Sequence, residues 1–520
     1  MRGCCRRLLK PEVIVFLLVW LGFSARFQSR AFNDPGALWH IKVGERILDD
    51  GFMTTDPFTY TFSGHMWIPQ QWGGEIAMAI AHRVAGFDGV LHLYTAMLAA
   101  LFAWIFSRMV RNGLHPVLAA TFTAGSAVVA AFHFYARPHM ATLAGMAIVM
   151  AAIIDFERGR AAPWRLWWLI PFSVLWTNIH GGVLGGVLTL GLAVAGWAAY
   201  SLLRPMIAGA KFEFATPIDR FRMLALLAGI VAACALTPFV NPFGMDMIET
   251  WKRIVGSSAM KDMVSEHQPL SLASTTGQVV VGFAAFYLIA LLGTLPRWPR
   301  VSWLLPLVWF ILSLKGIRQG PLFTVIGAVA LADFWPHTVW HRLLLKYGDS
   351  LARPPQVEGR GWCWMILPAA CVAIALNLQA NRIAVPVIGH GWARLDGAAV
   401  PIELTGALRD YQKQQTDGKT LFNDANLGGF VIYHAPGLKI FMDDRFELYG
   451  DPWLRDYVEV VYETPEVFDV WTEKYGFDAA LISVIPGTDR LPLEKYLSES
   501  ADRWVEVARC DCAVFFRRRP

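Results

Sequence analysis

Long apolar segments alternate with short polar connections along most of this chain. The first is Val13–Ala25, and those that follow are each roughly 15 to 23 residues long, as one helical membrane crossing requires. The later segments are Gly89–Val110, Pro116–Phe134, His139–Phe156, Trp164–Thr177, Gly182–Leu203, Phe221–Val240, Gly277–Leu295, Val301–Leu314, Pro321–Trp335 and Trp362–Leu378. The pattern predicts a polytopic bundle of α-helices with about eleven spans.

A long polar loop, residues 32–88, follows the first apolar segment. Asp34-Pro35 is typical of a helix start, and Gly51 of a helix stop, so a short helix is expected between them. Asp56-Pro57 has the same form. Asp34, Asp56 and Glu75 are therefore either helix caps and loop residues only, or candidate catalytic carboxylates at a membrane surface.

The residues from about Ala384 to Pro520 are charged and rich in turns. Short strands are expected at Thr420–Phe422, Leu438–Met442, Ala479–Val484, Val505–Ala508 and Ala513–Phe516. Helices are expected at Ile402–Gln415, Pro452–Tyr462, Pro465–Tyr475 and Pro492–Ser500. We therefore predict a membrane domain over residues 1–383 and a separate α/β domain over residues 384–520.

Polar turns follow the first two predicted strands of this domain. They contain Asn423 and Asp424 in one turn, and Asp443, Asp444 and Arg445 in the other. Open α/β sheets commonly bind ligands at the carboxyl ends of their strands, which favours an acceptor-binding or lid role. The same residues are also ordinary turn formers, and an Asp-Asp-Arg triple can pair with itself at a surface.

Composition supports an integral membrane protein. The chain is 55% hydrophobic and only 17% charged, and its mean hydropathy is +0.40. Its net charge of +5 comes from short basic clusters beside apolar segments, so anchoring at a membrane, and not nucleic-acid binding, is expected. The seven cysteines include Cys510 and Cys512, but none has the spacing of a metal site.

Basic residues in the short connections predict the orientation. They are Arg108, Arg111, Arg158, Arg160, Arg165, Arg204, Lys211, Arg220, Arg222, Arg297, Arg300, Arg342, Lys346, Arg353 and Arg360, and they fall on one side of the predicted bundle. The positive-inside rule makes this side cytoplasmic. We expect a multi-pass plasma-membrane protein with an inside N-terminus, an uncleaved first span, and the first loop and C-terminal domain outside.

The opposite, outer side carries basic residues in very short turns: Arg137, His139, His180, Lys315 and Arg318. Such groups can gather around a phosphate, for which arginine supplies a bidentate fork. Alternatively, Arg137 and Lys315 anchor helix ends, and the histidines are satisfied within their loops. Arg318 lies in a turn between two closely spaced segments and is expected to face the bundle interior.

The stretches DPGALWHIKVGERILDDG, TTDPFTY and WGGE in the first loop give the chain a resemblance to the GT-C class of membrane glycosyltransferases. The turns ARPHMATL and WTNIHGG and the tail NDANLGGFVIY with KIFMDDRFELYGD resemble a broad group of bacterial membrane proteins. The first acidic site departs from the class, because Asp34 stands between Asn33 and Pro35 and forms no Asp-Glu pair.

The resemblance implies transfer of a sugar from a polyprenyl-phosphate donor to a glycan, lipid or protein acceptor, usually with inversion. Asp34 would be the general base, with basic groups on the departing phosphate. Mg²⁺ or Mn²⁺ held by Asp34, Asp56 and Glu75 and a metal-free reaction are equally consistent with these residues. The alternative is a non-catalytic transporter or envelope scaffold, but few charges lie in the middle of the predicted spans and no internal repeat is present.

Overall fold

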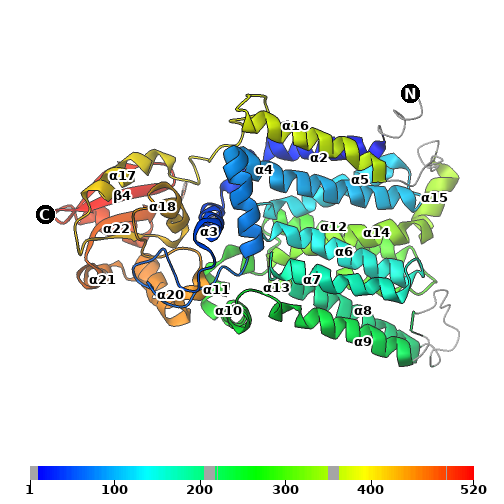
Figure 1. The fold of residues 1–520 in the computed structure, drawn as a ribbon. Helices are drawn as coiled ribbons and strands as arrows, with labels where there is room; N and C mark the ends of the chain where they lie inside the picture. The colour runs from blue at the N-terminus through cyan, green and yellow to red at the C-terminus, as the bar shows by residue number, and fades with distance from the viewer. Residues whose placement is uncertain are drawn as a thin grey trace.

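The structure is a computed structural model that describes residues 10–203, 206, 217–218, 221–348, 362–485, 487 and 489–520. A bundle of roughly parallel helices carries a smaller α/β domain at one end (Figure 1). Arg204, Lys211, Arg220, Arg353 and Arg360, which contributed to the predicted orientation, lie outside the described residues.

Every predicted apolar segment forms a helix of the bundle. The helices are α2 (Pro11–Arg26), α4 (Trp72–Arg111), α5 (Pro116–Ala130), α6 (Met140–Glu157), α7 (Leu169–Thr177), α8 (Val183–Leu203), α9 (Phe221–Leu236), α12 (Thr275–Leu292), α13 (Val301–Lys315), α14 (Gly320–Phe334) and α16 (Ile366–Ala380). Among the described residues, six helices are long and apolar enough to cross a membrane, or seven if the bent pair Ile317–His337 and Val339–Tyr347 is one span. The other apolar segments form shorter helices of the same bundle, so the polytopic helical fold is confirmed.

The first loop is shorter than predicted, because α4 begins at Trp72 and not near Gly89. The helix bends at Ala85 and Gly86, where Gly86 adopts φ 61°, a conformation that favours glycine. Before the bend, Met78 and Ala79 are buried. Glu75 therefore projects from a helix and not from a flexible loop.

The predicted short helix of the first loop is confirmed as α3 (Gly36–Asp50), which ends at Gly51 with φ 88°. It packs closely against the start of α4. A Cβ on Gly44 would lie 2.0 Å from the backbone oxygen of Glu75, so only glycine permits this approach. The loop is thus a rigid helical layer at the end of the bundle.

The C-terminal domain contains a four-stranded sheet in the order β1-β2-β4-β3. Its strands are β1 (Thr420–Asn423), β2 (Phe477–Ser483), β3 (Trp504–Arg509) and β4 (Ala513–Arg518), and β1 is parallel to β2 while the other pairs are antiparallel. The helices around it are α17 (Thr405–Gln414), α18 (Gly428–His434), α19 (Phe446–Tyr449), α20 (Asp451–Val458), α21 (Phe468–Tyr475) and α22 (Pro492–Glu499). The predicted α/β character is confirmed.

The predicted strand Leu438–Met442 is wrong, because this segment does not join the sheet. Ile440 instead forms a single parallel bridge with Thr59 of the first loop. The Tyr60 N–H donates to the Ile440 carbonyl over 3.1 Å, and the Ile440 N–H donates to the Phe58 carbonyl over 3.1 Å. The backbone groups of this segment are therefore satisfied by the first loop.

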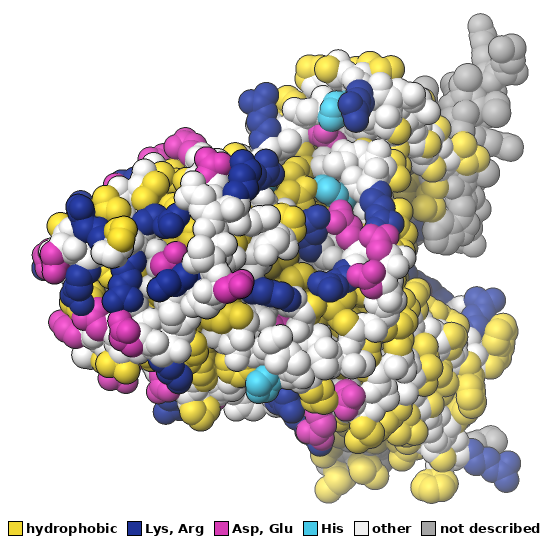
Figure 2. Space-filling model, turned by 60° about the vertical axis from the view of Figure 1, so that its left-hand side comes forward, with side chains coloured by type: hydrophobic (Ala, Val, Ile, Leu, Met, Phe, Trp, Pro, Cys, Tyr) yellow, Lys and Arg dark blue, Asp and Glu magenta, His cyan; other side chains and the backbone are white. Residues whose placement is uncertain are grey.

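The first loop and the C-terminal domain share one hydrophobic core. Leu38, Trp39 and Trp67 of the loop belong to the same buried cluster as Phe430 and Phe441 of the domain. Helices α10 (Met245–Gly256) and α11 (Ser258–Met263), from the connection between α9 and α12, also reach the domain. Figure 2 shows charged side chains of both signs over this part, whereas the side of the bundle is mainly hydrophobic.

The polar turns that the sequence places on one side of the bundle lie close together in the structure. They are the turns that contain Arg137, His180 and Arg318. The Gly73 N–H donates to the Asn178 carbonyl, and the Ala136 N–H donates to the Ala31 carbonyl. The Ile317 N–H donates to the Gln268 carbonyl. All of these turns meet at the end of the bundle that carries the C-terminal domain.

Candidate functional site

Arg137 lies between a carboxylate of the first loop and a carboxylate of the C-terminal domain. Its Nε is 2.8 Å from Asp34 Oδ1, and its Nη2 is 2.6 Å from Asp444 Oδ2. The Gly36 N–H also donates to Asp34 Oδ1 over 2.8 Å, so the local turn at the start of α3 fixes the carboxylate. The indole N–H of Trp39 donates to the other oxygen of Asp444. One guanidinium thereby holds two acids in a defined geometry.

Asp34 and Asp444 are both nearly inaccessible to solvent. Burial raises the pKa of each carboxyl group, and the positive charge of Arg137 opposes this rise. The two carboxylates in turn raise the pKa of Arg137 against the effect of its own burial. This arrangement keeps a carboxylate oxygen next to a permanent cation at the junction of the two domains.

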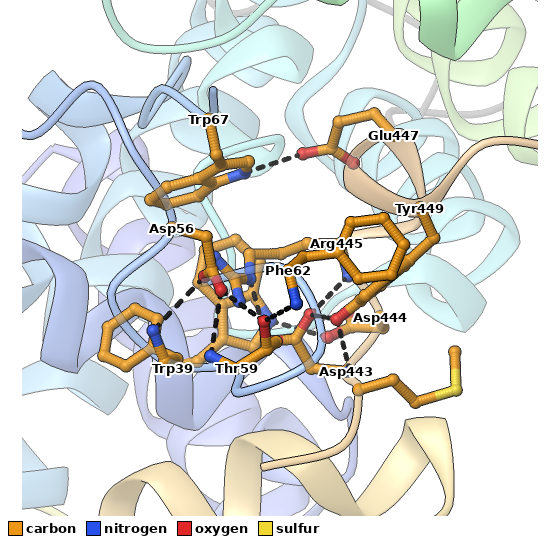
Figure 3. A network of polar contacts seen from close by, with 12 residues as sticks. Trp39, Asp56, Thr59, Phe62, Trp67, Asp443, Asp444, Arg445, Glu447 and Tyr449 are labelled. Atoms are coloured by element: carbon orange, nitrogen blue, oxygen red, sulfur yellow. Dashed lines mark hydrogen bonds and ion pairs between the residues drawn. The ribbon is translucent and has the colours of Figure 1, made fainter. Parts of the chain in front are cut away.

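A second cation, Arg445, joins the domain to the first loop (Figure 3). Its Nη1 is 2.8 Å from Asp56 Oδ1, and its Nε is 2.8 Å from Asp443 Oδ2. The guanidinium carbon also lies 4.5 Å from the centre of the Trp67 ring. Burial raises the pKa of Asp443 to about 6, although Arg445 opposes the shift.

Asp56 is held by its own turn as well as by Arg445. Its carboxylate accepts hydrogen bonds from the N–H groups of Phe58 and Thr59 and from the Thr59 hydroxyl. These bonds close a turn, and no helix begins after Asp56, so the helix start predicted at Asp56-Pro57 is wrong. The structure therefore gives Asp56 one contact within its own turn and one contact with the C-terminal domain, and its catalytic role stays a prediction.

Glu75 is buried at the interface of α3 and α4, where its Oε1 lies 2.9 Å from His40 Nδ1. Its Oε2 has no hydrogen-bond partner in the described part of the chain. Burial, followed by the charge of Arg137, lowers the pKa of His40 well below its usual value, so a neutral imidazole shares a hydrogen bond with Glu75. Burying an acceptor that lacks a partner costs free energy, and such groups are often functional.

Histidines and Arg318 form a second polar cluster at the same end of the bundle. The His139 ring lies 4.5 Å from the His133 ring and 6.3 Å from the His180 ring, centre to centre. Glu266 is 3.3 Å from His133, and Arg318 contacts His267. We call His133, His139, His180, Glu266, His267 and Arg318 the histidine cluster.

The histidines of this cluster that lie outside the spans are held neutral. Burial lowers the pKa of His139 well below its usual value and that of His180 to about 3, and nearby positive charge adds to the effect. His180 Nδ1 accepts a hydrogen bond from the Gly182 N–H over 2.9 Å. Its other ring nitrogen therefore carries the proton and can donate to an anion.

The other predicted site residues, Asn423, Asp424 and Lys315, belong to neither of these two polar clusters. Asn423 is fully buried, where its side chain donates to the Met442 carbonyl and accepts from the Phe441 N–H. Asp424 caps the next turn through the Asn426 N–H, and burial raises its pKa. Lys315 is exposed at the end of α13. Asn423 and Asp424 thus stabilise turns within the C-terminal domain, and these hydrogen bonds do not involve the first loop.

Several residues that complete the site could not be recognised from the sequence. Trp39 and Trp67 contact Asp444 and Arg445, and Glu447 accepts a hydrogen bond from Trp67. Glu266 and His267 come from the connection between α9 and α12, which carried no recognised motif. No group of three or more His, Cys, Asp or Glu in the described residues is arranged to hold a metal ion.

Comparison of the whole fold with solved structures identifies its architecture. The chain is similar to an oligosaccharyltransferase from Archaeoglobus fulgidus, solved with a tethered acceptor peptide containing an NVT sequon, with a TM-score of 0.51 and 13% identity over 92% of this chain and 69% of that one. The fold is that of the GT-C class.

The GT-C fold also gives a weaker match to ArnT from Cupriavidus metallidurans. The structure with undecaprenyl phosphate has a TM-score of 0.47 and 15% identity, and the apo structure has a TM-score of 0.41 and 14% identity, each over 97% of both chains. No protein-family model matches the sequence, and no curated protein matches it. The likeness to the oligosaccharyltransferase therefore lies in the fold.

Proposed function

We propose that the chain transfers a sugar from a polyprenyl-phosphate-linked donor to an envelope or extracellular acceptor at the outer face of the membrane. The observation that carries the proposal is the pairing of Asp34 with Arg137 at the end of a GT-C bundle, beside the histidine cluster. Such a reaction requires a carboxylate and positive groups at a membrane surface, and this site supplies both.

Asp34 is the proposed general base. It accepts the proton from the acceptor hydroxyl or amide as that group forms a bond to the anomeric carbon of the sugar. The bond between this carbon and the phosphate oxygen breaks, and the electron pair leaves with the polyprenyl phosphate. Attack on the face opposite the phosphate inverts the anomeric configuration. Arg137 positions Asp34 and holds the site close to Asp444 of the C-terminal domain.

The histidine cluster is the proposed site of the donor phosphate. Arg318 offers a fixed cation, and the neutral ring of His180 can donate a hydrogen bond to a phosphate oxygen. The N–H of the neutral His139 ring already donates to the His133 carbonyl over 3.2 Å, so His139 lines the site without donating to the phosphate. The burial of the His180 ring supports this role, because a hydrogen bond to an anion is stronger where water is excluded. Arg137 already contacts two carboxylates, so we assign it to Asp34 rather than to the phosphate.

The C-terminal domain is the proposed cover of the site. It is joined to the first loop by Arg445, by the Thr59–Ile440 bridge and by a shared core. A cover that excludes water would protect the donor from hydrolysis. Asp451 of the domain also accepts hydrogen bonds from Ser257 and Ser258, which fixes the connection that carries Glu266.

The proposal is tested by comparing lipid-linked sugars and surface glycans between a deletion strain and its parent. We expect one polyprenyl-linked sugar to accumulate and one envelope glycan to lose that sugar. Complementation with the wild-type gene should restore both, and complementation with an Asp34→Asn variant should restore neither. Unchanged lipid-linked sugars and glycans in the deletion strain would contradict the proposal and favour a scaffold.

A further inference from the structure

A large apolar groove lies in the side of the bundle, and its lining contains no residue of the histidine cluster. Its volume is about 820 Å³, within the range of about 300–1,000 Å³ that small-molecule pockets commonly have. Its walls come from residues 97–108 of α4, from residues 144–155 of α6, from the segment that precedes α7, and from Met365 before α16. Since α4 and α6 both start near the C-terminal domain, the end of the groove that is lined by Arg108, Asp155 and Arg165 lies at the opposite end of the bundle.

The body of the groove is lined by hydrocarbon side chains. Met97, Leu101, Ile148 and Ala152 are among them, and most of the lining residues are only half-buried. The groove is therefore an open, lengthwise depression in a surface that faces lipid, and not a closed core cavity. A flexible hydrocarbon chain can fill such a depression without leaving polar groups unsatisfied.

Exposed tryptophans beside the groove indicate the level at which its open end lies in the membrane. Trp164, Trp167 and Trp168 are 67%, 52% and 44% exposed, and they follow one another on the short segment beside the groove. Exposed tryptophans of this kind concentrate at the level of lipid headgroups. Trp164 and Trp168 also line the groove, so its mouth lies where a headgroup would be.

Two arginines lie at the mouth of the groove. Arg108 is already paired with Asp155, through contacts of 3.0 and 2.8 Å. Arg165 is exposed, lies 5.5 Å from the centre of the Trp164 ring, and forms no ion pair with any residue that the structure describes. One arginine at the mouth is therefore available to a negatively charged headgroup.

We propose that this groove binds one acidic phospholipid of the leaflet at that end of the bundle. An acyl chain would lie along Leu101 and Ile148, and the phosphate would pair with Arg165. The exposed cation favours an anionic over a zwitterionic headgroup, and the depth of the tryptophans favours a lipid over a soluble phosphate. The site is separate from the proposed catalytic site and does not depend on it.

The test uses the full chain in phosphatidylcholine nanodiscs that contain phosphatidylglycerol with a photoactivatable acyl chain. After irradiation, mass spectrometry locates the lipid-modified peptides. We expect labelling to concentrate on the groove segments of α4 and α6. Ala152→Trp, which fills the groove, should remove most of this labelling, whereas Ala228→Trp on the exposed face of α9 should not change it.

A second variant tests the headgroup. Arg165→Ala should lower labelling by phosphatidylglycerol about fivefold, as expected for one basic side chain at an anionic surface. Arg222→Ala, an exposed arginine elsewhere, is the matched control. Equal labelling by photoactivatable phosphatidylcholine, labelling spread evenly around the bundle, or labelling of the groove only by a photoactivatable polyprenyl phosphate would each overturn the proposal.

Discussion

Arg445 and Asp56 form an ion pair of 2.8 Å in which neither side chain is exposed to solvent. The pair joins the C-terminal domain to the first loop across a long separation in sequence. A buried charge that loses its partner is costly, because neither water nor another cation replaces it. This contact therefore gives a direct test of how firmly the domain is docked.

Arg445→Met should lower the free energy of unfolding by about 3–5 kcal/mol, because it leaves two buried carboxylates without their cation. The thermal unfolding midpoint in detergent measures the change. Arg83→Met is the control, since the Arg83–Asp49 pair is 43% and 60% exposed and should contribute less than about 1 kcal/mol. Similar midpoints for both variants would mean that Arg445 does not stabilise the docked state.

Asp34→Asn should lower sugar transfer by roughly 10²–10⁴ while the protein stays folded. The amide keeps the size of the side chain and can still accept from the Gly36 N–H, but it cannot take a proton. Transfer from a synthetic polyprenyl-phosphate sugar measures the loss. Asp49→Asn, at an exposed position of α3, should retain activity. A fully active Asp34→Asn variant would leave Asp34 with a structural role only.

Arg318→Lys should also impair transfer, mainly by raising the KM for the donor. A lysine keeps the positive charge but loses the planar fork that binds two phosphate oxygens at once. Lys315→Ala, which removes a nearby exposed charge, is the matched control and should have little effect. Free replacement of Arg318 by lysine would indicate simple anchoring of the helix end.

Acid should destabilise the docked site through its buried histidines. The pKa of His180 is lowered from 6.5 to about 3, so between these values the unfolded chain binds a proton that the folded chain does not. Its contribution to stability is therefore complete above pH 6.5 and decreases as the pH falls towards 3, by up to about 1.4 kcal/mol per pH unit.

Unfolding midpoints of His180→Gln and wild type, measured from pH 7.5 to pH 4.5, check this prediction. The variant should lose less stability on acidification than the wild type. His65→Gln, at an exposed position, should follow the wild-type curve. Parallel curves for all three proteins would show that His180 is not held neutral in the folded state.

If the C-terminal domain covers the site, weakening its contact with the first loop should increase hydrolysis of the donor by water. Asp444→Asn removes the charge that pairs with Arg137 but keeps an oxygen for the Trp39 indole. We expect more donor hydrolysis per transfer, measured as free sugar, even with excess acceptor. Deletion after Leu378 should have a larger effect. If excess acceptor restores normal transfer in these variants, the domain is a binding module and not a cover.

Local patterns were sufficient to predict most helices and strands of this protein. Apolar segments of membrane length became helices, Gly51 ended α3, and proline marked the start of α22. These features depend on neighbours within a few residues, so the sequence contains the required information. The segment Leu438–Met442 shows the limit. Its composition suits a strand, but its partner is Thr59, which no local pattern indicates.

The sequence by itself determined that this is a helical membrane protein with an α/β C-terminal domain, and which polar turns meet at one end of the bundle. Only the tertiary structure decided how the charged residues pair. Arg137 contacts Asp34 and Asp444, and Asp56 pairs with Arg445 of the distant domain. The physical reason is that hydrophobic periodicity is fixed by adjacent residues, whereas an ion pair depends on how two separately folded surfaces dock.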